Sequence, residues 1–274
     1  MPRLGKKPLP KFSVPPVIET VVGVEFRRLE SWSVPYFGLF WKQIKDRFPK
    51  FAVKPPLASQ IEIFEKPKAP PVPRLQFFTE PEIRCWFIDA ADRALIQVQS
   101  NRFTYNWRKT EADDSYPHYD EWVRPSFEDA WKQFLDFVRE QQLGDVEVLQ
   151  CEVSYINHIE VDKGWHTAAD LSTVFPCWSG KSRGEFLPAP EDVSFEVNYR
   201  LPDDRGRLRV SLSPAIRHKD GVEILQLTLT ARGKPTDGTT AATLEWIDLG
   251  REWVVRGFAD FTSANMHSLW KRTS

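Results

Sequence analysis

The sequence contains few cysteines and no long apolar run, and these absences exclude several classes of protein. Its three cysteines, Cys85, Cys151 and Cys177, are far apart, and none belongs to a CxxC motif or a Cys/His pair at metal-ligand spacing. No stretch approaches the roughly 20 apolar residues of a membrane helix, and no apolar signal-peptide core follows the basic N-terminus. We therefore predict a soluble, cytoplasmic protein with reduced, buried cysteines, no metal site and no cofactor.

Net charge is also nearly absent. The chain of 274 residues has 37 basic and 38 acidic side chains, which gives a formal net charge of −1. A balanced chain offers no whole-protein argument for nucleic acid or an anionic membrane as the partner. Glycine-rich phosphate loops and nucleophile elbows are missing as well, which counts against enzyme classes that depend on such local signatures.

Bulky aromatic residues, by contrast, are abundant. The chain has 11 Trp and 19 Phe against only 2 Met. Each aromatic ring can bury about 150–250 Å², so these residues supply a substantial core. We divide the chain into a flexible, basic and proline-rich arm (residues 1–16) and two α+β halves (17–145 and 146–274) within one compact globule.

Periodicity in the sequence predicts the elements of each half. For the first half we expect a helix that starts near Ser33, a helix that Ser126 and Asp129 open as a capping box, and strands at 17–26, 61–64, 75–78, 83–88, 94–99 and 103–107. For the second half we expect a short helix at 167–175, a long helix at 243–261, and strands at 146–161, 192–201, 207–216 and 222–231.

The order of these elements predicts an α+β fold. Both halves read as pseudo-equivalent β-α-β(3–4)-α units, although residue identity between them is too weak to define a sequence repeat. Together they would form an extended, curved antiparallel sheet backed by helices. The duplicated fold of the TATA-binding protein is the analogy, and a fold analogy does not by itself imply DNA binding.

The strand pair at 94–109 carries a polar face. Alternation places Gln97 and Gln99 on one face of the first strand, and Arg102, Asn106 and Arg108 on one face of the second. The opposite face of the second strand is aromatic and belongs in the core: Phe103, Tyr105 and Trp107. Guanidinium forks suit carboxylates or phosphates, and amides both donate and accept, so the polar set suits a ligand-reading surface. A solvated sheet face has the same composition.

A second candidate lies on the strand at 146–161, where Asn157 precedes His158. His158, with Glu160 two residues further on, fits an acid/base pair or a histidine held in one tautomer. A strand histidine bonded to a neighbour explains the same pattern. No nucleophile or second carboxylate is tied to His158 by spacing.

Five stretches also carry a family resemblance. They read PPVIETVVGVEF (15–26), WFIDAADRALIQVQSNRFTYNWRK (86–109), YPHYDE (116–121), CEVSYINHIEV (151–161) and a closing DLGREWVVRGFADFT…LWKR pattern (248–272). They resemble an uncharacterised, sporadically distributed family of bacterial and archaeal proteins of about 250–280 residues. The patchy distribution implies horizontal transfer and a conflict or defence context of the toxin–antitoxin kind. The resemblance adds weight to the candidates within these motifs: Gln97, Gln99, Arg102, Asn106, Arg108, Asn157 and His158.

Three functional hypotheses follow. The leading one is a non-enzymatic binding or regulatory protein whose polar sheet face holds a protein or an anionic small molecule, with Arg102 and Arg108 on the anionic group and the amides fixing its orientation. The first alternative is an enzyme acting on a phosphorylated or nucleotide substrate, with His158 as acid/base beside the two arginines as a clamp. The second alternative is a sheet that binds nucleic acid.

Overall fold

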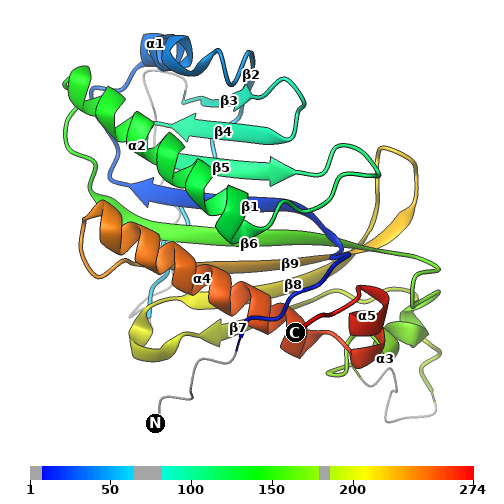
Figure 1. The fold of residues 1–274 in the computed structure, drawn as a ribbon. Coiled ribbons are helices and arrows are strands. Elements are labelled where there is room, and N and C mark those ends of the chain that lie inside the picture. Colours follow the sequence, from blue (N-terminus) through cyan, green and yellow to red (C-terminus); the bar gives the residue numbers. More distant parts are fainter. Residues whose placement is uncertain (1–7, 65–81, 179–185) are drawn as a thin grey trace.

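The computed structural model describes residues 8–64, 82–178 and 186–274, and within them nine strands form one antiparallel sheet (Figure 1). The strand order is β2-β3-β4-β5-β1-β6-β9-β8-β7. The strands are β1 (Val17–Phe26), β2 (Lys50–Lys54), β3 (Arg84–Ile88), β4 (Ala94–Gln99), β5 (Arg102–Arg108), β6 (Val148–Glu160), β7 (Phe195–Arg200), β8 (Arg207–Ile216) and β9 (Glu223–Gly233). The α+β class and the antiparallel sheet are therefore confirmed.

Helices and short turns complete the described chain. The α-helices are α1 (Val34–Ile44), α2 (Arg124–Glu140), α3 (Leu171–Val174), α4 (Thr240–Phe261) and α5 (Ala264–Leu269). Shorter helical turns are η1 (Tyr119–Val123), η2 (Ala168–Asp170) and η3 (Pro202–Asp204). No helix in the described ranges is both long and apolar enough to cross a membrane.

The chain between β2 and β3 departs from the prediction. Residues 61–64, expected to form a strand, lie outside the sheet and have no strand partner. The expected strand at 75–78 lies outside the described residues. The edge strand β2, in contrast, was not predicted, because its apolar residues Phe51 and Val53 are exposed and its alternation is therefore uninformative.

The start of α2 also differs from the prediction. The helix begins at Arg124 and is continuous with η1, a five-residue π-helix, so Ser126 lies inside the helix and no side chain caps its first turn. Asp129 forms an ion pair with Arg47 rather than closing a capping box. The predicted capping box is wrong because the helical geometry already starts at Tyr119.

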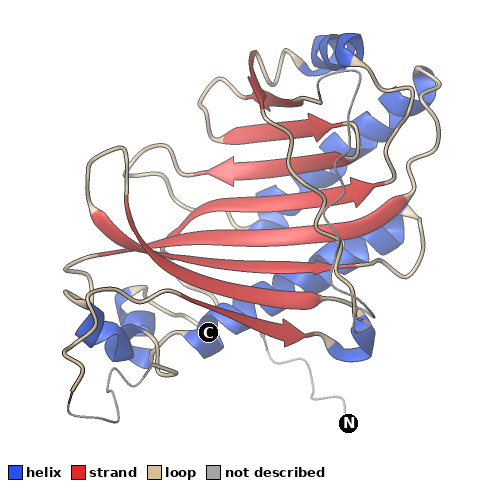
Figure 2. Ribbon diagram, turned by 180° about the vertical axis from the view of Figure 1, so that it is seen from behind, coloured by secondary structure: helices blue, strands red, loops and turns tan. Residues whose placement is uncertain are grey.

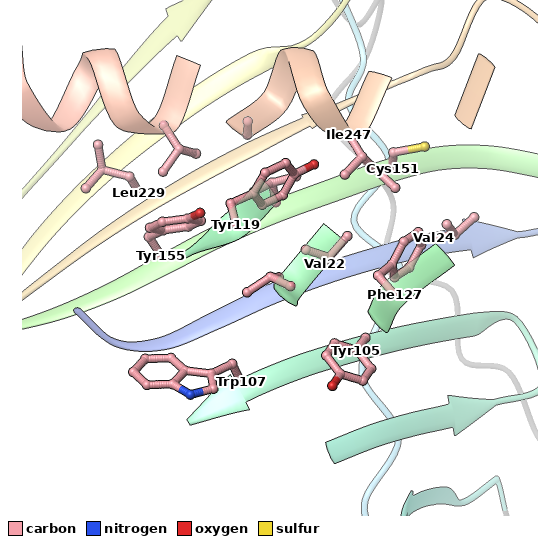
Figure 3. Packing of buried hydrophobic residues seen from close by; sticks show 14 of the residues in the cluster. Val22, Val24, Tyr105, Trp107, Tyr119, Phe127, Cys151, Tyr155, Leu229 and Ile247 are labelled. Carbon is pink, nitrogen blue, oxygen red and sulfur yellow. The ribbon is translucent and has the colours of Figure 1, made fainter. Parts of the chain in front are cut away.

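Helices α2 and α4 lie side by side on one face of the sheet and bury its aromatic residues (Figures 1 and 3). Phe103, Tyr105 and Trp107 are buried in this layer, as their alternation predicted. The Phe103 and Phe134 rings lie 5.0 Å apart, which links β5 to α2. At the centre of the sheet β1 pairs with β6, so the first strands of the two halves are neighbours.

The other face of the sheet is crossed by a segment of the chain itself (Figure 2). We name residues 57–64 the strap. It follows β2 and runs across the strands on the side opposite α2 and α4. The polar residues of the strand pair at 94–109 therefore face the strap and the open part of this face, away from the helices.

Candidate ligand-binding face of the sheet

Two glutamine side chains hold the backbone of the strap. The Gln99 amide accepts a hydrogen bond from the Leu57 N–H (2.9 Å) and donates one to the Leu57 carbonyl (3.0 Å). The Gln150 amide accepts from the Glu62 N–H (2.8 Å) and donates to the Gln60 carbonyl (2.9 Å). Each amide side chain thus pairs with the strap as a neighbouring strand would, and the strap needs no β-ladder to satisfy these backbone groups.

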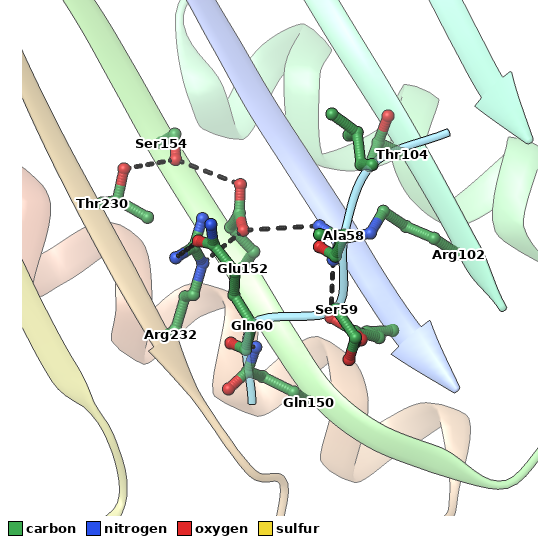
Figure 4. A network of polar contacts seen from close by, with 12 residues as sticks. Ala58, Ser59, Gln60, Arg102, Thr104, Gln150, Glu152, Ser154, Thr230 and Arg232 are labelled. Carbon is green, nitrogen blue, oxygen red and sulfur yellow. Dashed lines mark hydrogen bonds and ion pairs between the residues drawn. The ribbon is translucent and has the colours of Figure 1, made fainter. Parts of the chain in front are cut away.

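A charged network lies beneath the strap (Figure 4). Arg102, only 7% exposed, donates to Glu25 at 2.7 Å and lies 3.8 Å from the Glu152 carboxylate. Arg232 in turn pairs with Glu152 at 2.5 Å and donates to the Gln60 side chain of the strap. The two guanidinium groups of Arg102 and Arg232 therefore neutralise the carboxylates of Glu25 and Glu152. The charge of Arg102 is paired inside the protein.

A chain of amides leads from β3 to β1. The Arg84 guanidinium donates to Gln97 (2.8 Å), the Gln97 amide donates to Asn106 (2.9 Å), and the Asn106 amide donates to Glu19 (2.6 Å). Burial raises the pKa of Glu19, and the Asn106 hydrogen bond and the charge of Arg108 oppose that shift. Gln97 and Asn106 therefore connect a cation to a buried carboxyl group across four strands.

Three cations surround one indole at the open side of this chain. Lys54, Arg84 and Arg108 lie 4.8, 5.5 and 5.7 Å from the ring centroid of Trp86. We name these four residues the cationic cluster. Arg84 donates to the neutral Gln97 and Arg108 to the carbonyl of Asp92 (3.0 Å). None of the three cations forms a salt bridge with a carboxylate of the described residues.

The cationic cluster also contains unused donors. The Nε of Arg84, the Nε of Arg108 and the Nε1 of Trp86 are buried and have no hydrogen-bond partner among the described residues. Burial lowers the pKa of Arg84, and repulsion by Arg102 adds to the shift. The charge of Arg108 acts on Glu19, its partner in the register of β1 and β5, so one buried carboxyl group lies beside the three cations.

The two candidates on β6 lie elsewhere. Asn157 donates to the Leu227 carbonyl (3.0 Å) and lines a cavity beside α4. His158 lines a different cavity, whose described lining residues include Arg217 but neither Arg102 nor Arg108. Burial and the charge of Arg217 lower the pKa of His158. The structure therefore does not bring His158 together with the two arginines that the enzyme hypothesis requires.

The sequence pattern predicts part of the cationic cluster and leaves the rest unmarked. Arg108 is among the predicted candidates. Gln97 and Asn106, also predicted, form hydrogen bonds with Arg84 and Glu19, which lie beside Arg108. Trp86 opened the motif at 86–109, and alternation places Arg84 on the same face of β3, so a signal for both was present. Lys54 lies on β2, which the sequence pattern did not reveal.

Neither a metal site nor a similar protein indicates a function. Within the described ranges, no group of three or more His, Cys, Asp or Glu side chains is placed to hold a metal ion. Comparison of the chain with protein-family models, curated proteins and solved structures gives no match.

Proposed function

We propose that this protein is a non-enzymatic binding protein that holds an anionic group of a ligand or partner on the polar face of its sheet. The observation that carries the proposal is the cationic cluster, in which Lys54, Arg84 and Arg108 surround Trp86 without a salt bridge to a described carboxylate. The conflict or defence context implied by the family resemblance stays a prediction.

Unpaired charge at the cationic cluster costs free energy. Cations that are partly removed from water lose hydration, and this loss is offset only when an anion or a set of acceptors replaces the water. A carboxylate or phosphate placed beside the half-buried Arg84 and Arg108 accepts from the accessible N–H groups of their guanidinium forks, whereas the buried Nε–H groups lie out of its reach. Each charge-assisted hydrogen bond of this kind contributes about 1.5–3 kcal/mol.

Two of the other candidates, Gln97 and Asn106, act around the anion. Gln97 and Asn106 orient Arg84 and screen Glu19 from the bound group, since they already link the two ends of the amide chain. Gln99 and Arg102 have another role, because both hold the strap. The contribution of Arg102 to anion binding is therefore smaller than that of Arg108.

The proposal includes the pseudo-equivalence of the two halves. From β1 towards one edge of the sheet, the strands are β5, β4 and β3. From β6 towards the other edge, they are β9, β8 and β7. In each half, the strand that comes later in the sequence therefore lies nearer the centre. This order supports a duplicated unit of the kind found in the TATA-binding protein. It joins the polar faces of both halves into one continuous surface.

The test compares anions on matched variants. Isothermal titration at low salt would use inorganic phosphate, a hexaglutamate peptide and a single-stranded DNA oligonucleotide as probes. We expect at least one anionic probe to bind, and Arg84→Met/Arg108→Met to weaken it at least tenfold, since tenfold corresponds to about 1.4 kcal/mol. Arg209→Met is the control, because Arg209 is on the same face but pairs with Glu196.

Three results separate the possibilities. Equal affinity in the double variant and the wild type, or binding of none of the three probes, would refute the site. Binding of the oligonucleotide alone, with an affinity that falls steeply with salt, would support the nucleic-acid alternative instead. Binding of phosphate or hexaglutamate, lost in the double variant and kept in Arg209→Met, supports the proposal.

A further inference from the structure

A cavity of about 300 Å³ lies between η1, α4, the end of β6 and the N-terminal segment, on the helix side of the sheet. It is separate from the cationic cluster, which lies on the other face. We infer that this cavity is a second binding site, for a small amphipathic monocarboxylate. Cavities of this size, apolar with a few convergent polar groups, are typical of small-molecule sites.

One wall of the cavity is apolar. It is formed by residues from the N-terminal segment, from β1 and from one side of α4: Pro10, Phe12, Pro15, Val17, Val254, Val255 and Phe258. Phe12 packs edge-on against Phe258, with 5.4 Å between the two ring centroids, and this contact holds the N-terminal segment against α4. This wall suits an alkyl chain or an aromatic ring, whose transfer from water is favourable.

A single guanidinium provides the anion-binding group. The Arg251 side chain is only 14% exposed, lies 4.9 Å from the ring centroid of Tyr119, and has a buried Nε without a hydrogen-bond partner among the described residues. Its nearest carboxylate, that of the exposed Asp120, is 3.6 Å away, too far for a hydrogen bond. Arg251 forms a side-chain hydrogen bond with Tyr155 and an ion pair with Asp120, so it is largely desolvated, and its buried Nε is the donor left without a partner.

Two tyrosines complete the polar end. The Tyr116 and Tyr155 hydroxyls lie 2.7 Å apart, and burial raises the pKa of both, so both stay protonated near neutral pH. In such a pair one hydroxyl donates to the other, and one O–H remains free to donate to a ligand. A fork and a neutral hydroxyl match the two oxygens of a carboxylate.

The charges at the rim select the monocarboxylate over a phosphate. Asp120 and Glu121 also line the cavity, and both are exposed at its edge. Inside, Arg251 is the one guanidinium among the described lining residues. The exposed Lys11 also lines the cavity, so two cations and two carboxylates line it in all. The buried Arg251 matches a single negative charge, whereas a dianionic phosphate would need a second buried cation, which the described lining does not contain.

The backbone at the same rim is strained. His118 lines the cavity with φ 61° and ψ 139°, a conformation that side-chain-bearing residues rarely adopt. It is followed at once by the π-helix η1, which supplies Asp120 and Glu121. Strained residues and short π-helices both occur preferentially at functional sites, so this independent feature points to the same cavity.

The experiment is isothermal titration of the full chain with octanoate, octyl phosphate and 1-octanol. We expect octanoate to bind with one-to-one stoichiometry and more tightly than the other two. Arg251→Met should weaken octanoate at least tenfold and leave octanol unchanged, whereas Arg139→Met, which removes an exposed arginine from α2, should behave as the wild type. Val255→Trp, which fills the cavity, should abolish both.

Thermal unfolding of each variant identifies losses that come from misfolding, and Val255→Trp provides the test if Arg251→Met does not fold. Failure of the wild type to bind octanoate would overturn the inference, as would octanoate affinity that is unchanged in both variants. Tighter binding of octyl phosphate than of octanoate would overturn the assigned ligand class. None of these results depends on the cationic cluster, so this site and the proposed function fail or stand separately.

Discussion

Gln99 on β4 and Gln150 on β6 hold the same segment of chain, although β5 and β1 lie between their strands. Both use the side-chain amide as a substitute for a strand backbone, with one hydrogen bond accepted and one donated. The sheet therefore binds an extended peptide across its strands, where an ordinary β-ladder would bind one along them.

This arrangement predicts that the strap depends on the two glutamines. Gln150→Ala removes two hydrogen bonds and leaves an N–H and a carbonyl of the strap unpaired, so we expect a loss of about 1–3 kcal/mol in the free energy of unfolding. Gln99→Ala should cost a similar amount. Urea denaturation measures the loss, and limited proteolysis within 57–64 should become faster.

The matched control for the glutamines is Gln43→Ala. Gln43 is exposed on α1 and forms one side-chain hydrogen bond, with Glu140. Its substitution should change the free energy of unfolding by less than about 0.5 kcal/mol. If Gln150→Ala is no less stable than Gln43→Ala, the strap is not held by the amide pairs described here.

Much of the sheet was predictable because one of its faces is packed against helices. On β5 the aromatic residues alternate with polar ones, and burial of Phe103, Tyr105 and Trp107 against the helices fixes which face is which. The strap misled the same reasoning. Its Ile61 and Ile63 alternate with polar residues as in a strand, yet both are exposed, and the backbone is paired with glutamine side chains instead.

The candidate site was only partly predictable for a different reason. Alternation within one strand identifies which residues share a face, and it correctly grouped Arg108 with Asn106. It does not give the register between strands, which is what brings Lys54 opposite Arg84 and both beside Trp86. Pairing between strands is set by packing and by turns, so these neighbours are visible only in the folded chain.

The buried Glu19 predicts a specific dependence of stability on pH. Its pKa is raised in the folded state by burial, so between its ordinary value and the raised value the folded protein binds more protons than the unfolded chain. Stability from this group is present at pH below the ordinary value and is lost as the pH rises through the raised one. Glu19→Gln should therefore gain stability relative to the wild type as the pH rises from about 4, near the ordinary pKa of a glutamate, through the raised pKa.

Denaturation midpoints measured across that pH range test this expectation. The control is Glu30→Gln, which removes the same charge from a side chain that is 85% exposed. A Glu19→Gln variant whose stability relative to the wild type stays constant, or falls, as the pH rises would contradict the role of burial. The same variant should also bind anions at the cationic cluster more tightly, because it removes the negative charge that acts on Arg108.

His158 predicts the opposite slope on the acid side of neutrality. Burial, with the nearby charge of Arg217, lowers its pKa below the ordinary value of 6.5, so below that value the unfolded chain binds a proton that the folded protein does not. The wild type should lose stability as the pH falls from about 7 towards the lowered pKa, and His158→Gln should lose less. NMR titration of the imidazole resonances measures the pKa directly.

The control for His158 is His218→Gln, an exposed histidine in the turn between β8 and β9. It should leave the acid-side slope as in the wild type. A His158 resonance that titrates above 6.5 would show that its environment favours the charged form, contrary to the burial seen here.

Two glycines predict opposite effects of the same substitution. A Cβ at Gly233 would lie 2.1 Å from the Arg205 carbonyl oxygen and 2.7 Å from the Trp246 ring, so β9, the turn before β8 and α4 would all have to shift. Overpacking of this kind costs about 1–3 kcal/mol, and more where backbone atoms clash. A Cβ at Gly38 on α1 meets no atom within 4 Å, and alanine there should stabilise the helix by about 0.5–1 kcal/mol. Urea denaturation of Gly233→Ala and Gly38→Ala compares the two directly, and a Gly233→Ala variant as stable as the wild type would mean that Trp246 does not pack against this turn.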